Sequence, residues 1–344
     1  MRRVIFVAVS YVGAVVGAGF GSGREVLQFF AAYGMSGLWG AVWAGGLFAL
    51  VGAVLLRRVV SLGPDADYSF ALRDICGRRL GRAMDLVVFP FLLVALAVVL
   101  AGGAALLAAF GIPIALGAAL WALALGSATL AGRGALLWSN IAMVPLIFVY
   151  SVGAALFARS IGGTALTRSD TPLTVGPWIT GATLYVAYNT VLAFAALATL
   201  AARLKTRTEA VVAGVAGGLA LGFLCLLVTV ALLPFHARLS ASDLPLAAVF
   251  PPQHAFARLY PLCLGAALWT TGAAILVALQ PKLPPRPLWW SIVPIVLAYP
   301  LAQLGLGGLI QTVYPIMGYA GCPLLVLLIL SAFRRLPPAE RRSV

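Results

Sequence analysis

The chain has 344 residues, of which 62% are hydrophobic and only 9% are charged, and its formal net charge is +14. Soluble domains are charged at about a quarter of their positions, so this composition excludes an ordinary soluble protein and indicates a polytopic membrane protein. The positive charge is not a nucleic-acid signal, because the Lys and Arg residues lie mainly in short links on one side of the apolar segments.

Ten apolar segments follow one another along the chain, and a crossing helix needs about 20 apolar residues. We therefore expect an all-α polytopic membrane protein with a single transmembrane domain (1–344). The predicted spans are 4–33, 37–57, 84–110, 112–131, 135–158, 174–200, 209–234, 255–280, 287–306 and 309–333, followed by a cytoplasmic tail at 334–344.

The distribution of basic residues predicts the orientation. With the N-terminus inside, 18 of the 23 Lys and Arg residues lie on the inner side and four on the outer side. The positive-inside rule then places both termini in the cytoplasm and the protein in the cell inner (plasma) membrane. The longest inner link, 57–83, is expected to contain a short interfacial helix that faces anionic lipid, or alternatively an element of a cytoplasmic gate.

The spacing of the spans predicts an internal repeat. The starts of the first five spans (repeat one, 4–158) and the last five (repeat two, 174–333) differ by 170 to 175 residues. Because five is an odd number, the second set enters the membrane from the opposite side. A 5+5 inverted repeat of this kind is common in secondary transporters.

The first span carries an unusual glycine pattern. Residues 13–30 read GAVVGAGFGSGREVLQFF, with five glycines before Arg24 and Glu25. The glycines do not keep to one helical face, so we expect an unwound segment near the bilayer midplane, tolerated where it lines a cavity. Its freed carbonyls would coordinate a cation, and the second half-helix, beginning near Ser22–Arg24, would bind an anionic group.

The two charges in this span are candidates for function, because charged residues within a membrane are costly. Arg24 would cap the outer mouth or meet a substrate carboxylate, whereas Glu25 would hold an amine, a sodium ion or a proton. The alternative is that the span ends early and both are interfacial. Their adjacency places them about 100° apart on a helix, so they need not pair.

The repeat maps the first break onto the sixth span. There Tyr188, Asn189 and Thr190 interrupt an apolar segment, and we predict a second break at about 186–190. The alternative is that these polar side chains bond neighbouring helices. Gln311 and Tyr314 in the tenth span are weaker site candidates. The four cysteines have neither disulfide nor metal spacing.

Together these features resemble the LeuT fold of the amino acid–polyamine–organocation superfamily, in which helices 1 and 6 are broken near the membrane midplane. GAVVGAGF (13–20) is similar to the first break of neurotransmitter:sodium symporters. That resemblance implies a backbone sodium site from Gly13 and Val16, which span 8 completes with a small residue and two hydroxyl residues. The metal-site residues it implies are Gly13, Val16, Ala267, Thr270 and Thr271.

GAGFGSGREVLQFF is also similar to the first span of YkvI-like bacterial membrane proteins, in which a glutamine stands at the position of Arg24. The chain departs from the symporter pattern in two places. No Tyr stands in span 3 to bind a substrate carboxylate, and Phe20 replaces the Asn of a first sodium site, so that first site is not predicted.

The sequence thus predicts a secondary active transporter, a sodium-coupled symporter of an amino acid or small amine that works by alternating access. The expected substrate-binding residues are Gly19, Ser22, Gly23, Arg24, Glu25, Tyr188, Asn189 and Trp269. Na⁺ is the coupling ion, and no organic cofactor or nucleic acid is expected. The partners are a small-molecule substrate and the lipid bilayer.

Three alternatives stay open at this point. The first is a proton-coupled transporter that uses Glu25, and the second is a non-transporting receptor or channel of the same fold. An intramembrane enzyme is the third and the least favoured, because the only two histidines, His236 and His254, fall in an expected outer loop. We therefore predict that the protein is not an enzyme.

Overall fold

The computed structural model describes residues 1–63, 68–131, 133–161, 176–279, 290 and 292–334, and every regular element within these ranges is helical. In chain order the elements are α1 (Arg2–Val15), α2 (Ala18–Ser22), α3 (Arg24–Phe29), η1 (Ala31–Tyr33), α4 (Met35–Leu62), α5 (Tyr68–Cys76), α6 (Arg78–Ala108), α7 (Ile114–Ala131), α8 (Arg133–Ser160), α9 (Trp178–Ala201), α10 (Arg207–Leu232), η2 (Leu233–Phe235), α11 (His236–Leu239), η3 (Pro245–Ala248), α12 (Ala255–Leu279), α13 (Val293–Ala302) and α14 (Leu306–Ser331).

Each predicted span coincides at least in part with a helix, or, for the first span, with a series of short helices. Six of the described helices are long and apolar enough to cross a membrane: α4, α6, α9, α10, α12 and α14. The count of ten crossings and the cytoplasmic tail stay predictions, since nearly all of that tail lies outside the described residues.

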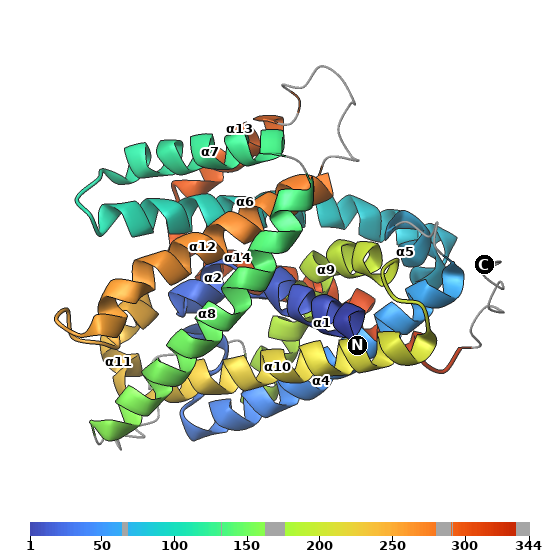
Figure 1. Cartoon of the computed structure of the whole chain (residues 1–344), viewed down its shortest axis with the longest axis horizontal. Coiled ribbons are helices and arrows are strands. Elements are labelled where there is room, and N and C mark those ends of the chain that lie inside the picture. Colours follow the sequence, from blue (N-terminus) through green and yellow to red (C-terminus); the bar gives the residue numbers. More distant parts are fainter. Residues whose placement is uncertain (64–67, 132, 162–175, 280–289, 291, 335–344) are drawn as a thin grey trace.

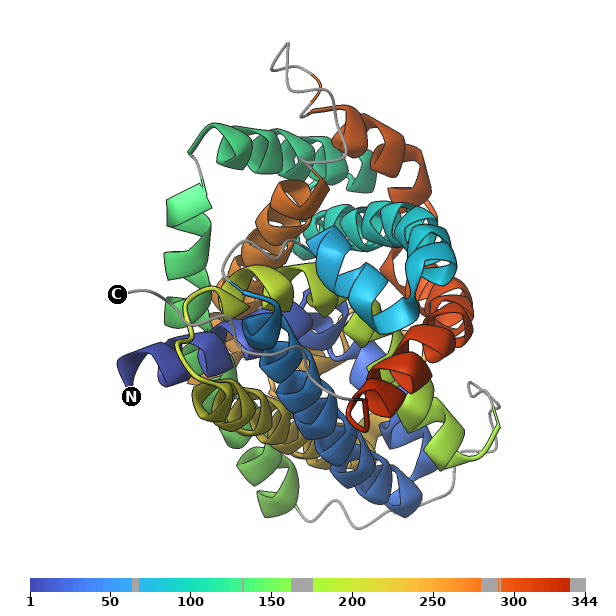
Figure 2. The same cartoon turned by 90° about the vertical axis from the view of Figure 1, so that its right-hand side faces the viewer.

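Segments that the sequence assigns to the same side of the membrane gather at the same end of the molecule. Figure 1 shows α5 and the link between α9 and α10 at the right-hand end, whereas α11 lies at the left-hand end. Figure 2, viewed from that right-hand end, shows α1 running from the edge of the molecule in among the other helices.

The first span is not one helix. α1 ends at Val15, and Val16 and Gly17 have extended backbone angles before α2 begins at Ala18. A second interruption follows at Gly23, whose φ of +83° lies in the left-handed region that glycine adopts without strain. The glycine-rich pattern thus produces two changes of direction within one predicted span, while their depth in a bilayer stays a prediction.

The predicted second break at 186–190 is wrong for this structure, because α9 runs without interruption from Trp178 to Ala201. The polar side chains that suggested it bond within their own helix instead. Asn189 donates to the Tyr185 carbonyl (3.0 Å) and Thr190 to the Val186 carbonyl (2.7 Å). Side chains of this type can bond the carbonyl four residues back while the backbone ladder stays intact.

α4 and α10 pack closely side by side through small residues (Figure 1). A Cβ added at Gly218 would lie 2.2 Å from the Ala49 nitrogen, and one added at Gly222 would lie 2.4 Å from the Gly45 Cα. Glycines four residues apart on α10 therefore permit backbone contact, which is how small residues drive helix association in lipid.

This contact predicts that Gly218→Ala lowers the stability of the protein by about 3 kcal/mol, because the new methyl group meets backbone atoms that cannot turn aside. Gly46→Ala is the matched control on α4. A Cβ there meets no atom within 4 Å, so the higher helix propensity of alanine should leave stability equal or up to about 1 kcal/mol higher. Thermal unfolding of the two variants in detergent checks the difference.

α5 forms the short helix expected in the link 57–83, and it is anchored from two sides. The Arg58 side chain of α4 pairs with Asp74 (Nε to Oδ2, 2.5 Å) and donates to the Ser331 carbonyl at the end of α14 (2.8 Å). Arg334 donates to the Ile75 carbonyl (3.0 Å). α5 is therefore fixed to the ends of both long helices.

We expect Asp74→Ala to destabilise the protein by about 3 kcal/mol, because it leaves the buried Arg58 guanidinium without its carboxylate. Arg73→Ala on the same helix is the control. Arg73 is exposed and donates only to the Ser69 carbonyl one turn away, so we expect a change within about 0.5 kcal/mol. Equal melting temperatures for the two variants would contradict this account of α5.

Candidate functional site

The interruption between α1 and α2 leaves carbonyl groups free of the helical ladder. In a continuous helix Gly17 would donate to Gly13 and Phe20 to Val16, but neither bond is present among the described backbone contacts. The Val16 carbonyl instead lies 3.5 Å from the Thr271 hydroxyl of α12. Uncoordinated carbonyls of this kind are oxygen ligands for a small cation.

α12 presents a face of small and hydroxyl residues to this interruption. A Cβ added at Gly21 would lie 3.3 Å from the Ala267 Cβ, and one added at Gly17 would lie 3.1 Å from the Thr271 Cγ2. The Thr270 hydroxyl donates within α12, to the Ala266 (3.2 Å) or Ala267 (3.1 Å) carbonyl. The structure therefore places Thr271 beside Val16, whereas Ala267, one turn earlier on α12, lies beside Gly21 of α2.

Glu25 does not point toward Arg24, its neighbour in sequence. Its side chain folds back over α2, so that a Cβ added at Gly19 would lie 2.0 Å from Glu25 Oε1. The residue is 4% exposed, forms no ion pair among the described side chains, and leaves Oε2 without a hydrogen-bond partner there. A buried carboxyl group in this situation needs a proton or a bound cation, since an isolated buried charge is costly.

Three tyrosines surround this carboxyl group. Tyr185 and Tyr188 of α9 and Tyr314 of α14 each interact with Glu25 electrostatically. The Tyr188 ring centroid lies 4.7 Å from that of Tyr314 and 5.5 Å from that of Tyr185. The buried hydroxyl group of Tyr188 lies within reach of Glu25, and that of Tyr185 within reach of Cys225. The cluster offers a carboxylate, two hydroxyl groups and aromatic faces, groups that suit an ammonium ion.

Arg24 reaches in the opposite direction, toward the segment between α11 and η3. Its Nη1 donates to the Ser240 carbonyl and to the Ser242 carbonyl (3.2 Å), and Asp243 attracts it electrostatically. Asp243 in turn accepts the Gly307 N–H at the start of α14 (2.9 Å). These contacts border a pocket of about 360 Å³ whose lining residues are Arg24, Ser240, Ala241, Asp243, Gly307, Gly308 and Gln311.

The other predicted substrate residues have structural contacts of their own. Ser22 accepts the N–H of Arg24, the first residue of α3 (3.1 Å), and Gly23 provides the turn between them. Asn189 is occupied within α9. Trp269 lies on the opposite side of α12 from Ala267 and Thr271, at about 100° per residue, and packs against the hydrophobic core. It is therefore not brought to the interruption.

Two residues of the site were not anticipated. Tyr185 lies three residues before Tyr188, a spacing that places both on one helical face, so this signal was available in the sequence. Asp243 attracts Arg24 electrostatically from far away along the chain. The sequence indicated that a buried guanidinium needs a carboxylate nearby, but it did not indicate which carboxylate that would be.

The solved structures that resemble this chain show that it has the LeuT fold. A manganese transporter of Eremococcus coleocola superposes with a TM-score of 0.60 over 94% of this chain and 78% of the other, at 17% identity. Mhp1, a nucleobase-cation-symport-1 family transporter in a closed conformation with bromovinylhydantoin bound, superposes with a TM-score of 0.53 over 94% and 76% of the chains, at 14% identity.

The sequence relatives are YkvI-like membrane proteins, as the first span suggested. The chain is 29% identical to the membrane protein YkvI of Bacillus subtilis over 338 residues, which cover 90% of each protein. It is 27% identical to the protein YyaD of the same bacterium over 328 residues, which cover 92% of this chain and 94% of the relative. No protein-family model matches the chain.

Proposed function

We propose that the protein is a secondary active transporter, a sodium-coupled symporter of a small amine or amino acid that works by alternating access. The observation that carries the proposal is the approach of the Thr271 hydroxyl to the Val16 carbonyl, where the helical ladder of the first span is interrupted. The fold supports the transporter class, because both structural neighbours described above are transporters.

In this proposal a sodium ion binds at the interruption. Sodium is a hard cation that prefers oxygen ligands, which the carbonyls of Gly13 and Val16 and the Thr271 hydroxyl would supply, and the small Ala267 would leave room one turn away on α12. In our proposal a bound ion would tie α1 to α12 across the break and so favour one of the two states of alternating access. Thr270 would join only after its hydroxyl turns away from its own helix.

The substrate would bind beside this ion, with its amine on Glu25 and the tyrosines. The hydroxyl groups of Tyr185 and Tyr188 would accept or donate hydrogen bonds there. A carboxylate on the substrate would meet the start of α3. Among the described residues, no group of three His, Cys, Asp or Glu side chains gathers that could hold a manganese ion.

A proton-coupled transporter is the second candidate, and a specific observation favours it. Glu25 is buried without an ion pair in the described structure, the condition in which a carboxyl group takes up and releases a proton as its surroundings change. In that case Glu25 would supply the coupling, and the Val16 carbonyl would need no ion. A receptor or channel of the same fold would bind the same ligand without moving it.

The test is thermal unfolding of the purified full-length protein in sodium and in potassium chloride of equal ionic strength, with a panel of amino acids and amines. A ligand at about 100 times its Kd stabilises the folded state by about 2.7 kcal/mol. A sodium-specific rise, enlarged by one amine, supports the symporter. A response that follows pH and ignores sodium transfers the coupling to a proton.

Uptake into proteoliposomes then separates a transporter from a receptor. The stabilising ligand, radiolabelled, should accumulate against its concentration gradient when sodium is present outside only. Binding without accumulation under either a sodium or a proton gradient would show a receptor, and dissipation of a ligand gradient without coupling would show a channel.

A further inference from the structure

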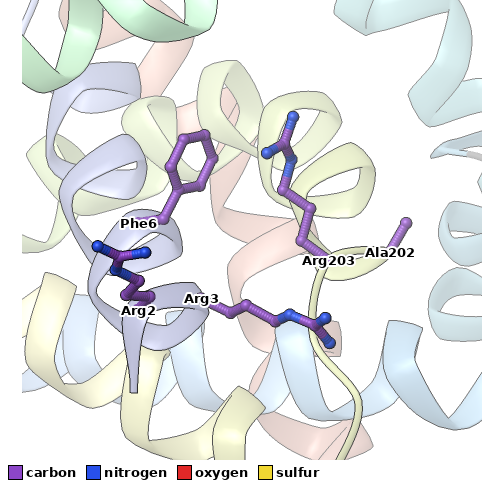
Figure 3. Close-up of a pocket in the computed structure, with 5 residues that line it drawn as sticks. All are labelled: Arg2, Arg3, Phe6, Ala202 and Arg203. Atoms are coloured by element: carbon purple, nitrogen blue, oxygen red, sulfur yellow. The ribbon is translucent and has the colours of Figure 1, made fainter.

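A second pocket, far from the glycine-rich interruption in the chain, is lined by three arginines. It has a volume of about 440 Å³, and its lining residues are Arg2, Arg3, Phe6, Ala202 and Arg203. Figure 3 shows Phe6 and Arg3 directed from α1 toward the link between α9 and α10, which carries Arg203. Two segments separated by more than half the chain thus form one basic pocket at the surface.

Arg203 is held by one aromatic contact, and none of the three arginines forms an ion pair among the described side chains. The Arg203 guanidinium lies 4.4 Å from the centre of the Phe6 ring, a cation–π contact that fixes its orientation. Glu209 interacts with Arg3 electrostatically, but its carboxylate accepts the Lys205 N–H (2.7 Å) at the start of α10 and does not line the pocket.

The start of α1 adds to the attraction for an anion. Its first turn contains no acidic residue, and no side chain caps it. The positive end of the helix dipole therefore acts in the same direction as the guanidinium groups. Arginine presents a planar fork that bonds phosphate oxygens in pairs, so a set of arginines around a cavity favours a phosphate group over a single halide ion.

We propose that this pocket binds a phosphate group, either the headgroup of an anionic membrane lipid or that of a soluble phosphorylated compound. The pocket lies on the side that the basic residues assign to the cytoplasm, where anionic lipids concentrate. A bound phosphate joins the start of α1 to the link after α9, and these two helices also contact each other.

General surface charge alone would attract anions without a defined site, and the chain offers a matched comparison. Arg78, Arg79 and Arg82 are three exposed arginines at the start of α6, on the same predicted side, and they do not line the pocket. Arg2→Gln/Arg3→Gln/Arg203→Gln and Arg78→Gln/Arg79→Gln/Arg82→Gln each remove three positive charges.

The experiment measures the binding of two probes to the full-length protein in a neutral detergent. The first probe is phosphatidylglycerol in mixed micelles, compared with phosphatidylcholine. The second is inorganic pyrophosphate, compared with chloride at equal ionic strength. The shift of the unfolding midpoint with probe concentration gives an affinity for each variant.

We expect the pocket variant to bind at least about tenfold more weakly than the α6 variant, because it loses paired, charge-assisted hydrogen bonds. Binding of phosphatidylglycerol alone identifies a lipid headgroup, and binding of pyrophosphate as well identifies a phosphate site open to soluble compounds. Equal losses in the two triple variants, or no stabilisation of the native protein by either probe, would overturn the proposal.

Arg203→Lys provides a second readout that does not depend on removing charge. It keeps the positive charge but loses both the guanidinium fork and its stacking on Phe6. A phosphate site predicts that affinity falls several-fold, whereas attraction by general charge predicts no change. Because it is a single substitution, this variant still tests the proposal if the triple variant fails to fold.

Discussion

Replacing Thr271 by Val should abolish the sodium-specific stabilisation of the protein while leaving its stability in potassium nearly unchanged. Valine has almost the same shape, and among the described bonds it removes only the long contact from the Thr271 hydroxyl to the Val16 carbonyl (3.5 Å). An ion present at about 100 times its Kd contributes about 2.7 kcal/mol, and that contribution should disappear. Unfolding midpoints in sodium and in potassium chloride measure it directly.

The control is Thr229→Val, the same exchange in a buried membrane helix. The Thr229 hydroxyl donates to the Cys225 carbonyl within α10 (2.6 Å) and has no contact with the interruption that any described bond records. Its variant should lose some stability equally in both salts and keep the full sodium response. A full sodium response in Thr271→Val would instead show that the ion does not bind at the break.

The interrupted first helix could be anticipated because its cause is local. Glycines at 17, 19, 21 and 23 disfavour a continuous helix wherever the chain is placed, and Gly23 takes a backbone angle that other residues avoid. Thr271 could be placed beside the break only through the resemblance to sodium symporters. Nothing in its local sequence, two threonines after a tryptophan, specifies an ion site.

The second interruption failed as a prediction because polarity alone does not break a helix. The side chains of Asn189 and Thr190 donate hydrogen bonds to the carbonyls four residues back, and the flanking apolar residues keep α9 helical. The first span differs because it contains several glycines, and glycine lowers the stability of a helix directly. A repeat in span spacing therefore did not imply a repeat in backbone geometry.

The partners of the two charges needed tertiary information. That Arg24 and Glu25 point in different directions followed from their adjacency on a helix. That Arg24 meets Asp243, and that Glu25 lies against Gly19 and among tyrosines of α9 and α14, depends on how distant helices pack. One sequence shows that a buried charge needs a partner, but it does not show which residue of a distant helix is that partner.

Replacing Glu25 by Gln should weaken amine binding by about 10- to 100-fold without unfolding the protein. Hydrogen bonds to a charged partner contribute about 1.5 to 3 kcal/mol, and the amide removes the charge. The fold should tolerate the change, because Glu25 forms no ion pair in the described structure and a neutral amide is cheaper to bury than a carboxylate. Titration of the stabilising amine in the thermal assay measures the loss.

Glu209→Gln removes the same charge at an exposed position where the side chain caps the start of α10, and it should leave amine affinity unchanged. The sodium response of Glu25→Gln then separates the two coupling schemes. If sodium still stabilises the variant while amine binding is weak, Glu25 holds the substrate and the ion binds at Val16 and Thr271. If the native protein responds to pH and not to sodium, and the variant loses that pH response, Glu25 carries the coupling proton. Unchanged amine affinity in Glu25→Gln would remove the carboxyl group from the substrate site.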